Sequence, residues 1–326
     1  MSTLNQPKLI TVFGGSGFVG RHVVRALARR GYRIRVAVRR PDLAGHLQPL
    51  GGVGQIAAVQ ANLRNRDSVD RAVRGADHVI NCVGILFESG RNSFDAVQDF
   101  GARAVAEAAR AEGAGLTHIS AIGADPDSDS IYARSKARAE AAIARIAPDA
   151  VIMRPSIIFG PEDDFFNKFA EMARLSPALP LIGGGETKFQ PVYVGDVAEA
   201  VALSVDGKLQ PGATYELGGP RVMTFKQCLE EVLETVHRKR VLMPLPWGLA
   251  SFVGKLASLV PLIDPPLTSD QVTLLKTDNI VSEVADADNR TLAGMGIRPS
   301  TIEAVLPSYL GRYRPHGQYS GTGSEA

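Results

Sequence analysis

Residues 9–20 read Leu-Ile-Thr-Val-Phe-Gly-Gly-Ser-Gly-Phe-Val-Gly, an apolar run followed at once by a glycine-rich turn. One of the first two glycines allows a tight reversal from strand to helix, Gly17 lets backbone amides approach a pyrophosphate, and Gly20 lets the helix pack closely on the strand. A helical stretch and a second apolar strand follow, so the order indicates a dinucleotide-binding turn rather than an ordinary glycine turn. The predicted contacts are Gly14, Gly15, Ser16, Gly17, Phe18, Val19 and Gly20.

The second strand ends in two arginines. The expected strand Arg33–Val38 is followed by Arg39 and Arg40, and no acidic residue occurs before Asp42. Folds that select NAD carry Asp or Glu here to bind the ribose 2′-hydroxyl, whereas Arg offers a charged, bidentate fork to a 2′-phosphate. The pattern favours NADPH (NADP) as the cofactor, with both arginines as ligands; the alternative is a solvated basic strand end.

Composition excludes several classes of function. The chain has 326 residues, 45% hydrophobic and 21% charged, and a net charge of +2, which argues against nucleic acid as the main partner. Cys82 and Cys228 lie far apart in apolar contexts, so we expect no disulfide. The histidines lack paired ligand spacing, so we expect no metal. We also expect no signal or transit peptide in the chain as given and no membrane-spanning run.

Apolar strands alternate with amphipathic helical stretches through the first half of the chain. We expect strands near Lys8–Phe13, Arg33–Val38, Gln55–Gln60, His78–Cys82, Leu116–Ser120 and Ala150–Met153. Helices are expected near Gly17–Arg30, Asp67–Arg74, Ser93–Glu112 and Ile131–Ala147. Right-handed crossovers then give an α/β fold, a Rossmann-type doubly wound parallel sheet over residues 1–155, with its ligand crevice beyond the strand C-termini.

Further cofactor contacts are expected where the strands end. Each candidate taken alone is more often part of a loop than of a site, and it is their shared edge of the sheet that groups them. They are Asn62, Leu63, Cys82, Val83, Gly84, Ser120, Ala121, Arg154, Pro155, Ser156 and Ile157.

After residue 155 the pattern becomes irregular, and we assign residues 156–311 to a smaller C-terminal α+β lobe. Within it, residues 186–206 are expected to return to the core as a strand-like run, Phe189–Val194, and a helix capped by Asp196. Thr224 is expected to cap another helix that runs to residue 237. Residues 312–326, rich in Gly, Ser and Pro, are predicted to be a flexible tail.

Tyr132 and Lys136 stand four residues apart at the start of a predicted helix, so both side chains lie on one face. With the upstream glycine turn, this pattern resembles the short-chain dehydrogenase/reductase superfamily. The resemblance implies that Tyr132 is the catalytic acid or base and that Lys136 binds the nicotinamide ribose and lowers the Tyr132 pKa. A phenol with a pKa of about 10 is a poor base at neutral pH without such help.

The chain departs from that superfamily at the position of its catalytic serine or threonine. Ile122 stands just past the fifth strand, where the superfamily places a donor to the substrate oxygen, and the connection to Tyr132 is short. Without that donor, a tyrosine–lysine pair loses electrostatic stabilisation of a typical size of several kcal/mol. Cofactor binding is therefore retained more completely than catalysis, and Tyr132 and Lys136 are vestigial as catalytic residues in this interpretation.

Six segments carry a narrower resemblance: Thr11–Gly20, Asn81–Leu86, His118–Ala121, Tyr132–Lys136, Arg154–Asp163 and Leu306–Leu310. They are similar to an atypical, NAD-dependent epimerase/dehydratase-like branch, the NADPH-binding accessory subunits of respiratory complex I (NADH:ubiquinone oxidoreductase) in their alphaproteobacterial form. The resemblance implies a tightly held, mainly structural NADPH and other complex I subunits as partners. It also implies a peripheral position near the quinone site, on the cytoplasmic face of the bacterial inner membrane.

Residues 241–275 support an interaction role. The segment is apolar with few charges, carries the only tryptophan, Trp247, near its head, and is too short and broken to span a bilayer. A short apolar helix with an aromatic anchor suits docking on a membrane surface or a membrane-proximal protein. The alternative is that this helix packs inside its own lobe.

Two functions follow as hypotheses. The first is an accessory subunit that holds a structural NADPH and stabilises the peripheral arm of the respiratory complex. The alternative is an NADPH-dependent reductase or epimerase that acts on a small-molecule or quinone-related carbonyl substrate, with Tyr132 as acid or base. A third function, an NADPH-sensing regulator, has no positive signal in the sequence.

Overall fold

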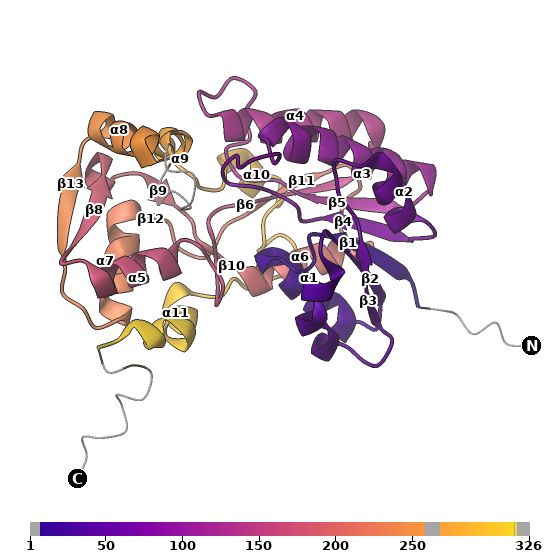
Figure 1. Cartoon of the computed structure of the whole chain (residues 1–326), viewed down its shortest axis with the longest axis horizontal. Coiled ribbons are helices and arrows are strands. Elements are labelled where there is room, and N and C mark those ends of the chain that lie inside the picture. Colours follow the sequence, from indigo (N-terminus) through magenta and orange to yellow (C-terminus); the bar gives the residue numbers. More distant parts are fainter. Residues whose placement is uncertain (1–6, 258–267, 316, 318–326) are drawn as a thin grey trace, which may run out of the picture. The chain divides into compact units, whose positions relative to one another are not determined.

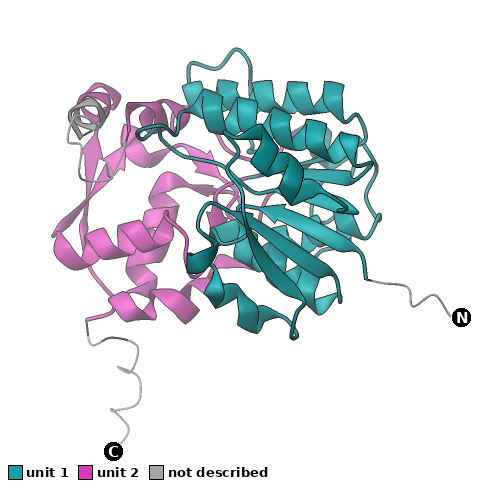
Figure 2. Cartoon of the chain, turned by 45° about the vertical axis from the view of Figure 1, so that its right-hand side comes forward, with its two compact units in different colours: residues 1–155, 195–217, 283–297 teal, residues 156–194, 218–282, 298–326 magenta. Residues whose placement is uncertain are grey.

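The chain divides into two compact units, each built from segments that are not contiguous in sequence (Figure 2). The computed structural model describes residues 7–257, 268–315 and 317. Unit 1 comprises residues 1–155, 195–217 and 283–297, and unit 2 comprises residues 156–194, 218–282 and 298–326. The segments that return to the first unit are therefore 195–217 and 283–297, whereas the sequence predicted a return over residues 186–206.

A parallel sheet forms the centre of unit 1 (Figure 1). Its order is β11-β6-β5-β4-β1-β2-β3, and every neighbouring pair is parallel. The strands are β1 (Leu9–Phe13), β2 (Arg33–Val38), β3 (Ile56–Gln60), β4 (His78–Asn81), β5 (Gly115–Ile119), β6 (Val151–Pro155) and β11 (Thr214–Leu217). The predicted doubly wound α/β fold is confirmed, and its switch point lies at β1, where the strand order reverses.

Helices cover both faces of this sheet. Figure 1 shows α2, α3 and α4 on one face and α1 and α6 on the other. Their bounds are α1 (Phe18–Arg29), α2 (Arg66–Val73), α3 (Phe100–Ala111), α4 (Ile131–Ile146), α6 (Val194–Val205) and α10 (Glu283–Ala287). Alanines such as Ala106, Ala109 and Ala139 are fully buried in the core beneath α3 and α4. Their small side chains let these two helices pack closely on each other and on the sheet.

Two predicted elements differ from the structure. The expected helix Ser93–Glu112 begins instead with a π-helical turn, Asp95–Asp99, before α3. The strand-like run Phe189–Val194 is wrong as one element, because β9 (Lys188–Phe189) and β10 (Val192–Tyr193) are separate short strands and α6 begins at residue 194. Asp196 consequently lies in the first turn of α6, where its negative charge interacts favourably with the positive end of the helix dipole.

Unit 2 is held together by aromatic packing and small two-stranded sheets. Phe165 packs edge-on against Phe166 and Phe169, with ring centroids 5.0 and 5.2 Å apart. The pairs are β10 with β7, β12 with β9, and β13 with β8. Beyond β9 and β10, the elements are β7 (Ile158–Phe159), α5 (Phe166–Leu175), β8 (Ala178–Ile182), β12 (Met223–Thr224), α7 (Phe225–Thr235), β13 (Val241–Leu245), α8 (Trp247–Ala257), α9 (Ser269–Leu274) and α11 (Ile302–Leu310).

The helix caps of unit 2 follow the sequence closely. Thr224 caps α7 in a reciprocal capping box with Gln227, as the sequence predicts. The carboxylate of Asp163 accepts hydrogen bonds from the first amides of α5 and from the Tyr309 hydroxyl of α11, at 2.6 Å for the latter. At the start of the predicted tail Tyr313 is only 8% exposed, and residues 316 and 318–326 of the tail lie outside the described part of the chain.

The predicted docking segment contains β13, α8 and α9, while residues 258–267 lie outside the described part of the chain. Ala250 is fully buried and Trp247 packs against the same apolar cluster, so one side of α8 belongs to the core of unit 2. Leu249 and Phe252 are 51% and 63% exposed. Within the described residues, no helix combines the length and the apolar character needed to cross a bilayer.

Candidate cofactor site

The glycine turn is built so that a nucleotide can approach its backbone. Gly14 has a φ of 72°, a left-handed conformation that glycine adopts without steric cost. A side chain at Gly15 would lie 2.7 Å from Val36, and one at Gly20 would collide with the carbonyl oxygen of Gly14. Gly17 precedes α1 and supplies no side-chain cap, so the first amides of α1 are available to phosphate oxygens.

Arg21 also belongs to this turn, although the sequence did not single it out. Its guanidinium donates hydrogen bonds to the carbonyl oxygens of Ser16, at 3.1 Å, and Gly17, at 3.3 Å. These bonds brace the turn and bring a positive charge beside the expected phosphates. The only sequence signal is that Arg21 directly follows Gly20, a position that also suits an ordinary solvated residue.

The two arginines that follow β2 differ in their surroundings. Arg40 forms an ion pair with Asp42 at 2.7 Å, and the two side chains are 68% and 58% exposed. Such an exposed pair contributes little to stability and exchanges readily. Arg39 is exposed and has no ion-pair partner among the described residues, so its charge is available to a 2′-phosphate.

Lys136 is buried beside the end of β5. Its side chain is 4% exposed, and its ammonium donates a hydrogen bond to the carbonyl oxygen of Ile119 at 3.2 Å. Burial lowers the Lys136 pKa to about 8, a shift that Glu140 partly opposes. A Cβ at Gly84 would lie 3.4 Å from this ammonium, so the glycine keeps the space beside it open. An ammonium has three donors, which leaves capacity for the hydroxyls of a ribose.

Tyr132 lies on the same helix as Lys136, and its side chain is half-buried. Its ring packs edge-on against Phe94, with centroids 6.0 Å apart, and the Lys136 ammonium lies 5.8 Å from the Tyr132 ring centroid. Burial raises the Tyr132 pKa to about 12, the opposite direction to the lowering that the resemblance implies. Ile122, which the resemblance aligns with the hydroxyl donor of the superfamily, is 9% exposed.

Two buried polar groups at the end of β5 have unused hydrogen-bonding capacity. The Ser120 hydroxyl and the Nε2 atom of His118 have no hydrogen-bond partner within the described chain, although both residues are at most 4% exposed. The Asn81 amide oxygen accepts from Val83, so its NH₂ group faces Nδ1 of His118 and leaves the proton on Nε2. Hydrogen-bond acceptors of a bound nucleotide would satisfy such unpaired buried donors at this edge of the sheet.

Several other predicted contacts lie at the same edge of unit 1. A side chain at Gly14 would lie 3.0 Å from Val83, which places the end of β4 against the glycine turn. Cys82 is partly buried, and burial raises its pKa to about 12. Asn62 uses its side-chain oxygen to accept from the Arg64 amide at 3.1 Å. Leu63 is 8% exposed, and Ala121 is partly exposed.

The remaining predicted contacts have protein partners of their own. Arg154 donates to Glu140 at 2.9 and 2.5 Å and lies 3.6 Å from Glu216, so its charge is already neutralised. The Pro155 carbonyl accepts from the Ile122 amide at 3.0 Å. Ser156 and Ile157 belong to unit 2, where the Ser156 hydroxyl donates to Asn279 at 2.7 Å. No cluster of metal-ligating side chains occurs among the described residues.

A parallel sheet with a glycine turn after its first strand and a helix N-terminus facing that turn defines a dinucleotide-binding protein of the Rossmann class. The chain belongs to the NAD dependent epimerase/dehydratase family, whose model matches residues 10–218. The fold agrees, because the structure superposes on the Thermus thermophilus UDP-glucose 4-epimerase complex with NAD. That match has a TM-score of 0.67 at 22% identity and covers 94% of this chain and 99% of the epimerase.

Similarity to individual curated proteins is more specific than the match to the family. The chain is 34% identical to the mitochondrial NADH dehydrogenase (ubiquinone) 1 alpha subcomplex subunit 9 of Arabidopsis thaliana, over 96% of this chain and 79% of the relative. It is also 36% identical to a ceramide reductase of Caulobacter vibrioides, over 58% of each chain. The first similarity extends through both units, whereas the second covers little more than half of the chain.

Proposed function

We propose that the chain is an accessory subunit of the membrane-associated respiratory NADH:quinone oxidoreductase and that it holds a mainly structural NADPH. The observation that carries this proposal is the 34% identity to a subunit of that complex along 96% of the chain. As a peripheral protein it would stabilise the arm of the complex near the membrane and the quinone site, on the cytoplasmic face of a bacterial inner membrane, among the other subunits.

The residues of the candidate site in unit 1 have the charges and hydrogen-bond donors that binding of NADPH requires. The amides of the glycine turn and Arg21 would bind the pyrophosphate, Arg39 the 2′-phosphate, and Lys136 the nicotinamide ribose. Bound NADPH would supply a hydride donor at this edge of the sheet. Partial burial raises the pKa of the half-exposed Tyr132 to about 12, and Ile122 stands at the position that the resemblance assigns to a hydroxyl donor; both favour holding the cofactor over using it.

Similarity to a ceramide reductase favours a second candidate, an NADPH-dependent reductase of a carbonyl substrate. That function needs Tyr132 to deliver a proton, so Tyr132→Phe would abolish turnover while cofactor affinity stays nearly unchanged. Steady oxidation of NADPH by the purified protein on a defined carbonyl substrate, lost in this variant, would favour the reductase over the accessory subunit.

Substitution of Arg39 tests the cofactor proposal. Arg39→Asp is expected to weaken NADPH binding about 10- to 100-fold, because charged hydrogen bonds to the 2′-phosphate are replaced by repulsion. The measurement is the NADPH content of the complex purified from membranes, together with the amount of this subunit in it. If NADPH is structural, both quantities fall together.

The matched control is Arg25→Asp, which makes the same change of charge at an exposed arginine of α1. It should leave the NADPH content unchanged. A complex that assembles normally without NADPH in the Arg39→Asp variant would separate the cofactor from assembly. An unchanged NADPH content would show instead that the arginine is a solvated strand end.

We propose that the exposed side of β13 and α8 is the part of residues 241–275 that contacts the membrane surface. Val241, Met243, Leu249 and Phe252 are between 51% and 68% exposed, although all are large and apolar. No acidic residue occurs from 237 to 263, whereas residues 238–240 are Arg-Lys-Arg. An apolar stretch of sequence preceded by cations and without carboxylates of its own fits the interface of an anionic bilayer.

Vesicle flotation tests this surface. Phe252→Glu is expected to reduce co-flotation of the protein with phosphatidylglycerol vesicles several-fold, because a charge replaces an aromatic group that would enter the interface. Leu175→Glu is the control, since Leu175 is 75% exposed on α5 of the same unit and lies outside the segment. Equal flotation of both variants and the unaltered protein would contradict the proposal.

A further inference from the structure

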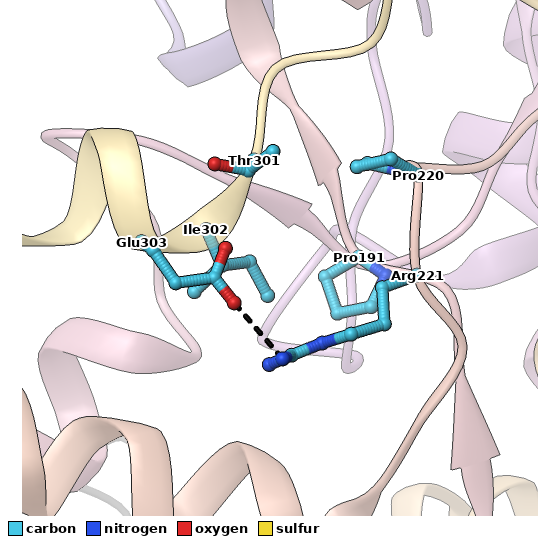
Figure 3. Close-up of a pocket in the computed structure, with 6 residues that line it drawn as sticks. All are labelled: Pro191, Pro220, Arg221, Thr301, Ile302 and Glu303. Carbon is cyan, nitrogen blue, oxygen red and sulfur yellow. Dashed lines mark ion pairs between the residues drawn. The ribbon is translucent and has the colours of Figure 1, made fainter.

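A second preformed hollow lies in unit 2, outside the cofactor site. Figure 3 shows its lining residues, which come from three separate segments of the chain. They are Pro191, Pro220, Arg221, Thr301, Ile302 and Glu303. The cavity has a volume of about 150 Å³. An engineered protein cavity of about this size accepts a benzene molecule, so one aromatic ring is the appropriate size for the occupant.

The apolar walls of this hollow are held rigidly. Backbone and side-chain hydrogen bonds, at 3.1 and 2.9 Å, join Gln190 and Gly219, the residues that directly precede the two prolines. A side chain at Gly219 would collide with the Pro191 carbonyl, so the two loops are in close contact. Ile302 is 5% exposed and forms part of the core of unit 2. The hollow therefore requires little ordering when a ligand enters.

Arg221 forms the polar side of the hollow, and two carboxylates orient its guanidinium, although the side chain is 53% exposed. Its guanidinium lies 3.0 Å from Glu303, the pair marked in Figure 3, and 3.2 Å from Glu231. One guanidinium nitrogen also contacts the sulfur of Met223 at 3.3 Å. A planar guanidinium beside an apolar hollow offers the kind of face contact that aromatic rings favour.

A neighbouring hollow shares Arg221 and is acidic. Its lining residues are Arg221, Val222, Met223, Gln227, Glu230, Glu231 and Glu234. The three glutamates come from α7, and Val222, which lines the same hollow, is 45% exposed. Burial and the nearby carboxylates of Glu303 and Glu234 raise the Glu231 pKa, whereas Arg221 lowers it. Glu231 pairs with Arg221 at 3.2 Å and Glu230 with Lys226 at 3.8 Å. Glu234 is therefore the glutamate of this hollow without an ion pair among the described residues, and it would accept a cation from a partner.

We infer that the two hollows form one docking surface for a protein segment that carries an aromatic residue next to lysine or arginine. The ring would enter the hollow between the prolines and stack on Arg221, and the basic side chains would lie along the glutamates of α7. The size of the first hollow, the guanidinium beside it and the glutamates of the second hollow together favour this chemistry. The inference concerns unit 2 alone and does not depend on the cofactor or on membership of the respiratory complex.

Peptide titration of the full chain tests this surface. The probes are acetyl-Gly-Phe-Lys-Lys-Gly-amide and the same peptide with alanine in place of phenylalanine. The phenylalanine peptide should bind at least about tenfold more tightly, the factor expected for burial of one aromatic side chain. Arg221→Ala should remove most of that ratio. Glu234→Lys should weaken both peptides by a similar factor and leave the ratio intact.

The control variant is Arg174→Ala, which removes another exposed arginine of unit 2 that pairs with a glutamate, Glu171, at 3.2 Å. It should bind both peptides like the unaltered protein, and thermal unfolding checks that every variant is folded. Equal affinity for the two peptides overturns the inference. So does a ratio that survives Arg221→Ala, or the absence of binding by the phenylalanine peptide at its highest soluble concentration.

Discussion

Arg154→Met is expected to lower the free energy of unfolding by about 3 to 5 kcal/mol, the cost typical of leaving a buried charge without its partner. Arg154 donates to Glu140 at 2.9 and 2.5 Å and pairs with Glu216 at 3.6 Å. The two carboxylates are only 9% and 12% exposed, so removal of the guanidinium leaves two mostly buried charges without their partner. The same hydrogen bonds raise the Arg154 pKa, because the charged form is the one they stabilise.

Urea denaturation of the cofactor-free protein measures the change. Arg145→Met on the same helix as Glu140 is the control, because Arg145 is exposed and its loss should cost less than about 0.5 kcal/mol. A double variant, Arg154→Met with Glu140→Leu, should recover part of the loss by removing one of the unpaired charges. A small loss of stability combined with a large loss of bound NADPH would instead identify Arg154 as a cofactor ligand.

The fold of unit 1 was predictable because local patterns determine it. Strand bounds such as Arg33–Val38 agree with the apolar runs, and the glycine turn follows from steric limits that only glycine meets. The division into two units was not predictable in detail. Residues 283–297 join unit 1 far along the chain, a pairing that depends on tertiary contacts and leaves no periodic signal.

Residue types in the site were predictable, whereas their electrostatic states were not. The spacing of Tyr132 and Lys136 placed both on one helix face, but the Tyr132 pKa depends on how deeply its ring is buried. Arg154 at a strand end suggested a ligand contact, and the carboxylates that neutralise it come from α4 and β11. Arg21 had no distinguishing motif, since its role comes from reaching back to two carbonyl oxygens.

Lys136→Met is expected to have opposite effects on stability and on cofactor binding. The Lys136 ammonium is buried, 4% exposed, and Ile119 alone among the described residues accepts a hydrogen bond from it. The fall of its pKa from 10.5 to about 8 corresponds to about 3 kcal/mol of unfavourable burial. Methionine has a similar volume and no charge, so the cofactor-free variant should be more stable by up to about 3 kcal/mol at pH 7.

The pH dependence gives an independent test of the same charge. Between pH 8 and 10.5, the unfolded chain binds a proton on Lys136 that the folded chain has already lost. The free energy of unfolding contributed by this group therefore rises with pH across that window, and below it the full cost of burial is present. The Lys136→Met protein should lack this rise. Identical pH profiles for the two proteins would contradict a buried, poorly paired ammonium.

Cofactor binding should change in the other direction. Lys136→Met is expected to weaken NADPH binding about 10- to 100-fold, because charged hydrogen bonds to the ribose hydroxyls are lost. Tyr132→Phe is the control on the same helix face and should leave the NADPH affinity nearly unchanged. A residue that destabilises the empty protein and strengthens the complex with its ligand is retained for the ligand. The charge of Arg154 is satisfied within the protein. Arg154→Met should therefore lower the stability of the empty protein and leave its NADPH affinity nearly unchanged.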